Sequence, residues 1–239
     1  MKPLKLLLAA IAFSSIFGTG AAPAADLAVK AVPAKPAFSW TGFYAGVHGG
    51  AGVLFDAGYQ TLILNDKHGV GGLAGGQIGF NYQTGMLVLG IEAEGFWSGM
   101  KVNSDAFNAN TWFATATVRN RWDVDIAGRF GVAFDRALVY GKAGWVFGGF
   151  DWNYNTAFGY SNRASATLDG LLIGLGLEYA FLNNWTAKFE YDYLGFGARN
   201  VHFTEACSGG GCFILPNGFT QNVSADKHIF KLGINYKTN

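Results

Sequence analysis

Acidic side chains at alternate positions are the first candidates for chemistry in this sequence. Glu92 and Glu94 are separated by one residue, and so are Glu190 and Asp192. In an extended chain such residues point to the same side, where paired carboxylates could act as general acid and base. The same pairs would equally suit a structural ion network, which we favour. The sequence has no G-x-S-x-G, P-loop or HExxH motif.

Two of the four histidines are candidate ligands for a cofactor. His68 and His202 are expected at the loop end of the molecule, where either could ligate hemin iron. The segments expected to be loops also contain aromatic residues that could stack on a porphyrin, namely Tyr59, Tyr154, Phe158 and Tyr160. Exposed aromatic residues in loops have many other causes, so hemin is an alternative cofactor and no metal site is predicted.

The N-terminus has the pattern of a secretory signal peptide. Two lysines precede an apolar run over residues 6–17, and small residues then lead to Ala22-Pro23-Ala24. The run is short for a spanning helix, which needs about 20 residues. We predict a signal peptide at 1–24, a flexible periplasmic tail over 25–37 with two prolines, and one domain over 38–239.

The two cysteines lie in the longest polar segment near the C-terminus. Cys207 and Cys212 bracket the tetrapeptide Ser-Gly-Gly-Gly. In an exported chain an even pair at this spacing predicts a disulfide. A metal site with the C-x4-C pattern would need two further ligands, and none are close in sequence.

Composition narrows the class of protein. The chain of 239 residues is 50% hydrophobic and 16% aromatic, but only 14% charged, against about 25% charged in soluble domains. The formal net charge of +1 gives no sign of the basic surface that nucleic-acid binding requires. After the signal peptide, the most apolar stretch, residues 171–182, is too short and too polar for a helical span.

The elements that carry the acidic pairs are predicted to be β-strands. In the last stretch Phe230, Leu232 and Ile234 alternate with Lys231 and Gly233, which is the two-residue period of a strand with different surroundings on its two faces. Seven earlier segments share this period, at about 38–53, 70–82, 87–94, 118–134, 139–147, 171–179 and 185–193. The sequence therefore predicts eight strands, with the last closing against the first.

The connections between these strands alternate in length. Three are turns of a few residues, and four are longer polar segments. An up-and-down barrel with an even number of strands collects its short turns at one end and its long loops at the other. We predict an all-β fold, an eight-stranded antiparallel up-and-down transmembrane β-barrel, with the long loops outside the cell.

The two faces of the strands distinguish a membrane barrel from a soluble one. The uncharged face is aromatic and aliphatic, with more bulk than the narrow lumen of eight strands can hold. The other face holds ionisable groups that could neutralise one another as an interior charge network: Glu92, Glu94, Arg129, Lys142, Glu178, Lys188, Glu190, Asp192 and Lys231. Asp123 and Asp125 lie on the same face. Aromatic residues at the strand ends suit an interfacial girdle, namely Trp40, Trp97, Trp122, Trp185 and Tyr236.

Several stretches together resemble one protein family. They are FSWTGFYAGVHGG near residue 38, the hairpin GGQIGFNYQ–GIEAE, and KHIFKLGINYK from Lys227. The chain resembles the eight-stranded outer-membrane barrels of alphaproteobacteria, which include rhizobial and brucella major outer-membrane proteins and bartonella hemin-binding proteins. The resemblance implies insertion by the outer-membrane assembly machinery and roles in envelope integrity and host contact. In contrast to the usual aromatic C-terminus, Tyr236 is followed by three further residues.

These observations predict a structural role rather than catalysis. We expect a non-enzymatic protein of the bacterial outer membrane that supports the envelope and displays surface loops as an antigen. A hemin-binding or narrow-pore protein is the alternative, and an enzyme comes third because only His202 with Glu205 hints at a catalytic pair. The expected partners are outer-membrane lipid, lipopolysaccharide, the assembly machinery and a host surface ligand.

Overall fold

The computed structural model describes residues 38–55, 68–106, 114–156, 160–207 and 218–238. The predicted signal peptide and tail lie outside this range and stay predictions. Within the described residues no helix is long and apolar enough to cross a membrane. The strands are β1 Gly42–Phe55, β2 His68–Thr84, β3 Leu87–Ser98, β4 Lys101–Ala106, β5 Ala114–Phe134, β6 Ala137–Thr156, β7 Tyr160–Ala180, β8 Trp185–Cys207 and β9 Phe219–Lys237.

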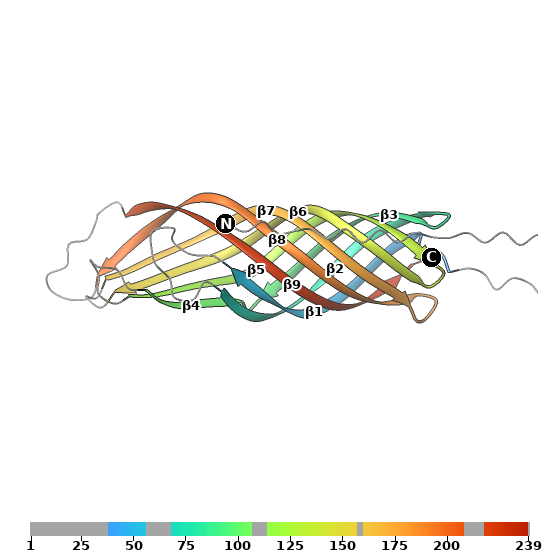
Figure 1. Cartoon of the computed structure of the whole chain (residues 1–239), viewed down its shortest axis with the longest axis horizontal. Helices are drawn as coiled ribbons and strands as arrows, with labels where there is room; N and C mark the ends of the chain where they lie inside the picture. The colour runs from blue at the N-terminus through green and yellow to red at the C-terminus, as the bar shows by residue number, and fades with distance from the viewer. Residues whose placement is uncertain (1–37, 56–67, 107–113, 157–159, 208–217, 239) are drawn as a thin grey trace, which may run out of the picture. The chain divides into compact units, whose positions relative to one another are not determined.

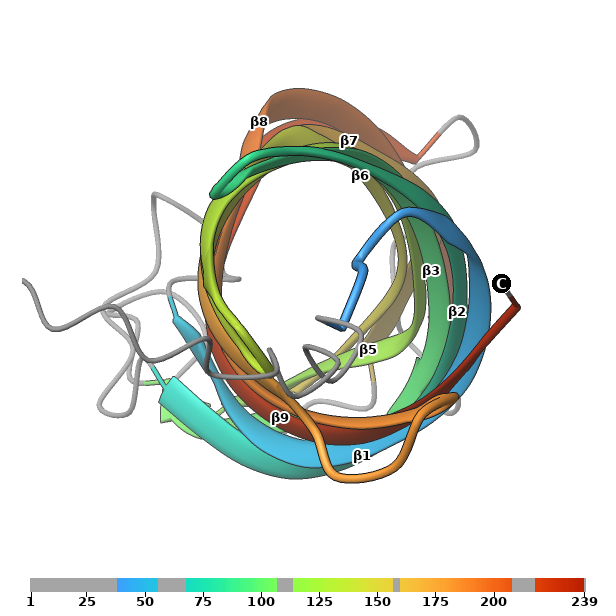
Figure 2. The ribbon, with the colours of Figure 1, turned by 90° about the vertical axis from the view of Figure 1, so that its right-hand side faces the viewer.

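The strands form a closed antiparallel ring (Figures 1 and 2). Their order is β3-β2-β1-β9-β8-β7-β6-β5, and the pairing of β3 with β5 closes the circle. The short β4 pairs with β5 beyond β3, so β3 and β4 together occupy one position in the wall. The predicted eight-stranded up-and-down fold is therefore confirmed, and β9 pairs with β1 from Lys237 opposite Tyr44 to Asp226 opposite Phe55.

The short turns gather at one end of the barrel. Gly85 between β2 and β3 has a φ of 60°, and Asp135 between β5 and β6 has a φ of 52°, the left-handed conformation that tight hairpin turns require. The residues after Tyr236 lie at the same end. Thr238 donates its backbone N–H to the carbonyl of Phe43 at 2.8 Å, so the unusual C-terminus extends the closing pair of strands.

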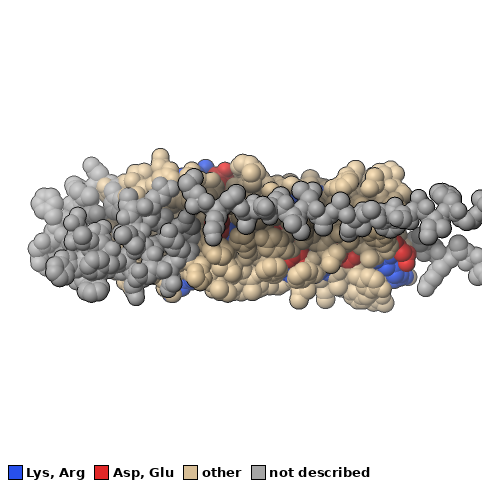
Figure 3. Space-filling view, viewed as in Figure 1, with Lys and Arg blue, Asp and Glu red and all other residues tan. Residues whose placement is uncertain are grey.

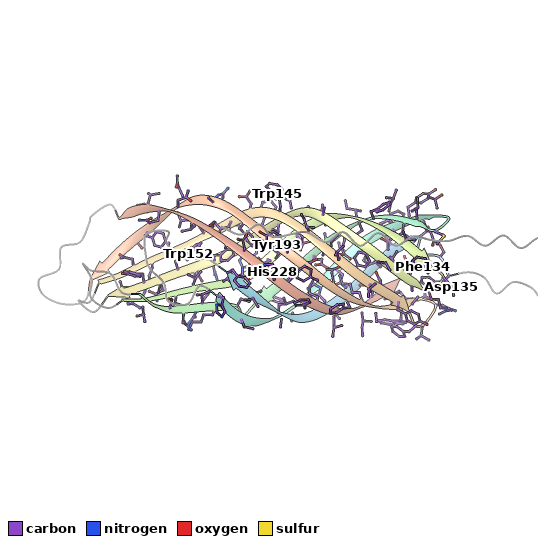
Figure 4. All side chains as sticks on the ribbon, in the orientation of Figure 1. Phe134, Asp135, Trp145, Trp152, Tyr193 and His228 are labelled. Atoms are coloured by element: carbon purple, nitrogen blue, oxygen red, sulfur yellow. The ribbon has the colours of Figure 1, made fainter. Side chains whose placement is uncertain are left out.

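The outer surface of the barrel changes character along the strands. On β7 the outward side chains nearer the short turns are apolar and 55–66% exposed, namely Leu171, Ile173, Leu175, Leu177 and Tyr179. Nearer the long connections the outward positions carry Arg163, Ser165, Thr167 and Asp169. We call the part with the apolar outer face the inner half and the part with the polar outer face the outer half. In Figure 4 Phe134 and Asp135 mark the end of the inner half, and Trp152 lies in the outer half.

The interior changes in the opposite sense. The inner half contains the charged side chains, whereas the outer half encloses an apolar cluster that includes Leu54, Val118, Phe150, Trp152, Leu168, Phe196, Phe203 and Val223. The sequence predicted a lumen lined by ionisable groups. This prediction is wrong for the outer half, whose interior is mostly apolar. The outer half instead has the apolar core and polar surface of a soluble barrel.

This inversion also corrects the predicted strand ends. Residues 101–111, 151–164 and 201–225 were expected to be connections because of their polar composition. Much of each segment is strand, since β6 continues to Thr156, β8 reaches Cys207 and β9 begins at Phe219. Most polar residues in the described part of these strands face outward above the lipid-facing surface, so polarity there marks exposure to water rather than the end of a strand.

The predicted position of one girdle residue, Trp40, is wrong. Trp40 is only 1% exposed and packs inside the turn end of the barrel in a second apolar cluster with Leu138 and Tyr140. Its indole N–H donates to the backbone carbonyl of Asp135 at 3.2 Å. Trp97, at 76% exposed, does lie on the outer face.

Candidate functional site in the barrel interior

The charged interior is built from alternate positions of six strands. Strand β3 supplies Glu92 and Glu94, β5 supplies Arg129, β6 Lys142, β7 Glu178, β8 Lys188, Glu190 and Asp192, and β9 Lys231. Each of these nine side chains is buried. Figure 3 shows the outside of the same strands, where the part not drawn in grey is mostly uncharged. Alternation thus keeps lipid and charge on separate faces of one wall.

Arg129 organises the end of the network nearer the short turns. Its guanidinium lies 3.2 Å from Glu92 and 2.7 Å from Glu178, and it stacks 3.9 Å from the ring centre of Tyr140. The hydroxyl of Tyr44 donates to Glu92 at 2.8 Å. Two carboxylates and two rings therefore hold one guanidinium, which uses its planar shape as well as its charge.

Three lysines and three carboxylates form the centre of the network. Lys142 lies 2.8 Å from Glu190, and Lys231 lies 2.7 Å from Glu190 and 2.6 Å from Asp192. Lys231 also forms an ion pair with Glu94. Each carboxylate meets more than one ammonium group, as buried charges require if they are to be compensated.

The bond between Lys188 and Glu94 crosses the full width of the lumen. Their charged atoms are 2.6 Å apart. Strands β8 and β3 are separated by four steps around the ring in either direction, so the two residues come from opposite walls. A direct salt bridge therefore spans the diameter of the lumen at this level.

The same carboxylates could in principle bind a metal ion. One oxygen from each of Glu92, Glu94 and Glu190 lies within 4.8 Å of the others. The ammonium groups of Lys142, Lys188 and Lys231 already lie among them. We therefore assign these acids to the ion network. Acid–base catalysis by Glu92 with Glu94 is the less favoured alternative, because lysines lie beside both carboxylates.

A second buried ion pair was not predicted. Lys227 bonds to Asp123 and, at 3.2 Å, to the amide oxygen of Asn120. Its ammonium group lies 4.8 Å from the ring centre of Phe196 and 5.4 Å from that of Phe150. The pair therefore marks the boundary between the charged interior and the apolar cluster. Continuing the inward period of β9 from Lys231 by four residues would have found Lys227.

Charge in the lumen is nearly balanced overall. The buried charged side chains of the described barrel comprise seven carboxylates and six basic groups. Asp125 stands apart, because it is 2% exposed and neither of its carboxylate oxygens has a hydrogen-bond partner among the described residues. It faces the inside of β5 opposite Glu94.

The two predicted hemin ligands do not come together. In the sheet, His68 lies opposite Phe55 of β1, and Phe55 lies opposite Asp226 of β9. His202 lies opposite Thr220 of β9. Six residues separate these two levels of β9, about 20 Å along a strand. Both histidines are exposed on the outer face, whereas Tyr154 is buried. Hemin binding stays a prediction, tested by hemin titration of the folded protein beside His68→Ala and His202→Ala, where an absent Soret shift in the parent contradicts it.

The structure describes only part of the predicted disulfide and of the candidate catalytic pair His202 and Glu205. Cys207 ends β8, whereas Cys212 lies outside the described residues, so the bond stays a prediction. His202 lies 3.5 Å from the hydroxyl of Thr220, and the side chain of Glu205 is outside the description.

Comparison with known proteins adds the family. The family described as "Outer membrane protein beta-barrel domain" matches residues 16–237. The chain belongs to this family. It is therefore a β-barrel protein of the bacterial outer membrane, and the family resemblance and location predicted from the sequence are confirmed.

Two relatives are similar over much of their length. The 31 kDa outer-membrane immunogenic protein of Brucella melitensis biotype 1 is 32% identical over 97% of this chain and 98% of its own. The 22 kDa outer membrane protein of Rhizobium leguminosarum bv. viciae is 32% identical over 70% of each chain. Among solved structures, OprG of Pseudomonas aeruginosa is 11% identical, with a TM-score of 0.49 over 84% of this chain and 97% of its own.

Proposed function

We propose that this outer-membrane barrel is a closed structural protein that supports the envelope and carries loops on the cell surface. The observation that supports a closed barrel is the salt bridge between Lys188 and Glu94, which joins opposite walls. Solutes would have to break it and then pass an apolar cluster. A narrow pore is therefore the weaker alternative.

Two apolar clusters support the same proposal. Trp40 and its neighbours fill the turn end of the lumen, and Phe150, Trp152 and Phe203 are part of the packed core of the outer half. An ion that crossed the barrel would lose its water at both levels, and removing water from an ion costs several kcal/mol or more. The ion network between them lies behind an apolar barrier at each end.

A role without catalysis is part of the proposal. Apart from Asp125, the buried acids of the described barrel lie beside lysines or an arginine, which argues against a substrate site among them. The relatives are named for their location and immunogenicity. Surface display would place the long connections between β1 and β2 and between β8 and β9 outside the cell, as in other outer-membrane barrels.

Planar-bilayer recording of the folded protein tests the closed state. We expect no steady conductance from the parent protein. Substituting Ala for Lys142, Lys188 and Lys231 together removes the cations from the centre of the lumen and leaves its carboxylates, so any current it passes should favour cations. Large steady openings of the parent would overturn the proposal.

Support of the envelope needs a test in cells. A strain that lacks the gene should become more sensitive to detergent than its parent, and the intact gene should restore resistance. Restoration by a variant with shortened surface loops would separate envelope support from loop display. Unchanged detergent resistance of the deletion strain would contradict the structural role.

A further inference from the structure

A polar groove lies on the outside of the barrel immediately beyond its apolar surface. It has a volume of about 430 Å³ and is lined by residues of β5, β6 and β7, including Arg119, Arg121, Asp151, Arg163 and Ser165. Lys101 of β4 lies opposite Arg119 in the β4–β5 ladder, at the edge of the groove. We call this site the basic groove.

A β-bulge sets the position of the groove against the lipid-facing surface. The pairing of β5 with β6 shifts between Asn120 and Trp122. Asn120 and Asp123 are buried inside, while Arg121 is exposed and Trp122 half-buried on the outside. A bulge places consecutive side chains on one face, and here it sets a guanidinium beside the tryptophan at the upper edge of the apolar belt.

The groove carries an excess of positive charge. Asp151 uses one carboxylate oxygen to bind Arg121 at 2.8 Å and the other to accept the Ser165 hydroxyl at 2.6 Å. Within the part of the chain that the structure describes, Arg119 and Arg163 have no carboxylate partner. Elsewhere on the outer half Arg199 is matched by Asp169 at 2.7 Å.

We propose that the basic groove binds the phosphate group of a phosphorylated glycolipid in the outer leaflet of the membrane. Guanidinium groups recognise phosphate by paired hydrogen bonds, and Arg119 and Arg163 present them from different strands. The acyl chains of the lipid would lie on the apolar surface directly below, beside Trp122 and Phe147. The site does not depend on whether the lumen conducts.

The matched test compares two pairs of arginines. One variant combines Arg119→Gln with Arg163→Gln, and the control combines Arg136→Gln at the turn end with Arg199→Gln outside the groove. Each removes two positive charges. Native mass spectrometry of the folded full chain in a non-ionic detergent measures binding of bisphosphorylated lipid A and of the same lipid without phosphates. Heat-modifiable gel migration verifies folding of each variant.

The groove variant should bind bisphosphorylated lipid A about thirtyfold more weakly, since each cation near an anionic lipid surface contributes about fivefold. The control should bind within about threefold of the parent, and lipid A without phosphates should bind all proteins weakly. Equal binding by groove variant and parent would overturn the proposal. If inorganic phosphate alone displaces the lipid at equal concentration, the ligand is free phosphate and the glycolipid assignment falls. If the double variant does not fold, each single variant should show a loss of about fivefold.

Discussion

Replacing Glu94 by Gln and Lys188 by Met, singly and together, measures what the salt bridge across the lumen contributes. The charged atoms are 2.6 Å apart and both side chains are fully buried. At an effective dielectric constant of about 20 their Coulomb attraction is about 6 kcal/mol. Removing both charges from water costs several kcal/mol each, so the net contribution is much smaller than the attraction.

Each single substitution removes one charge from the buried network, so the charges that remain around it are less well balanced. We expect either one to lower the free energy of unfolding by about 3–5 kcal/mol. Glu94→Gln should be the more severe, because Glu94 also pairs with Lys142 and Lys231. The double variant restores charge balance, so its loss should be smaller than the sum of the two single losses by about 2 kcal/mol.

Urea titration of the barrel in phosphatidylcholine vesicles, followed by tryptophan fluorescence, gives these free energies. The control is the exposed pair of Arg199 and Asp169, which has a similar separation of 2.7 Å but side chains that are 54% and 30% exposed. Its coupling energy should stay below about 1 kcal/mol. Additive losses for Glu94 and Lys188 would refute the conclusion that the two residues form a direct buried bond.

Three further predictions concern the wall of the barrel. Leu175→Arg on the lipid face should destabilise the barrel in vesicles by about 2–4 kcal/mol, whereas Thr167→Arg on the same strand should cost less than about 1 kcal/mol; equal losses would remove the boundary between the two halves. Gly176→Ala should cost about 1–3 kcal/mol, because a Cβ atom there would lie 2.2 Å from the Tyr140 ring, while Gly141→Ala, where the nearest atom is 3.8 Å away, serves as control in the same urea titration. In outer-membrane fractions the protein should migrate differently before and after boiling, and a single position for both samples would argue against a barrel.

Local sequence pattern was enough to predict most of the inner half. The alternation of Phe230, Leu232 and Ile234 with Lys231 depends only on the two-residue period of a strand, so it can be read without knowledge of any partner. The same holds for the outward set of β7 and for the inward acids of β3. Strand ends were predicted less well, because polar outward residues such as Thr167 and Asn153 resemble those of a loop.

The composition of a strand alone does not reveal a change of solvent along it. On β7 the outward residue is polar at Asp169 and apolar at Leu171, while the inward residue is apolar at Leu168 and small at Gly174. Both halves keep the same period, and only the meaning of the two faces reverses. Trp40 was misplaced for a related reason, since an aromatic residue beside a strand suits a membrane interface and a packed core equally well.

The sequence by itself determined the strand period, the class of barrel, the family and the identity of most of the charged residues that face inward. Only the tertiary structure decided which charges meet. Lys188 and Glu94 are 94 residues apart, and Lys227 and Asp123 are 104 apart, so no local pattern relates them. Their contact depends on the closure of β3 onto β5 and on the stagger of every pair around the ring, because a shift of one residue in any pair would turn one partner out of the lumen.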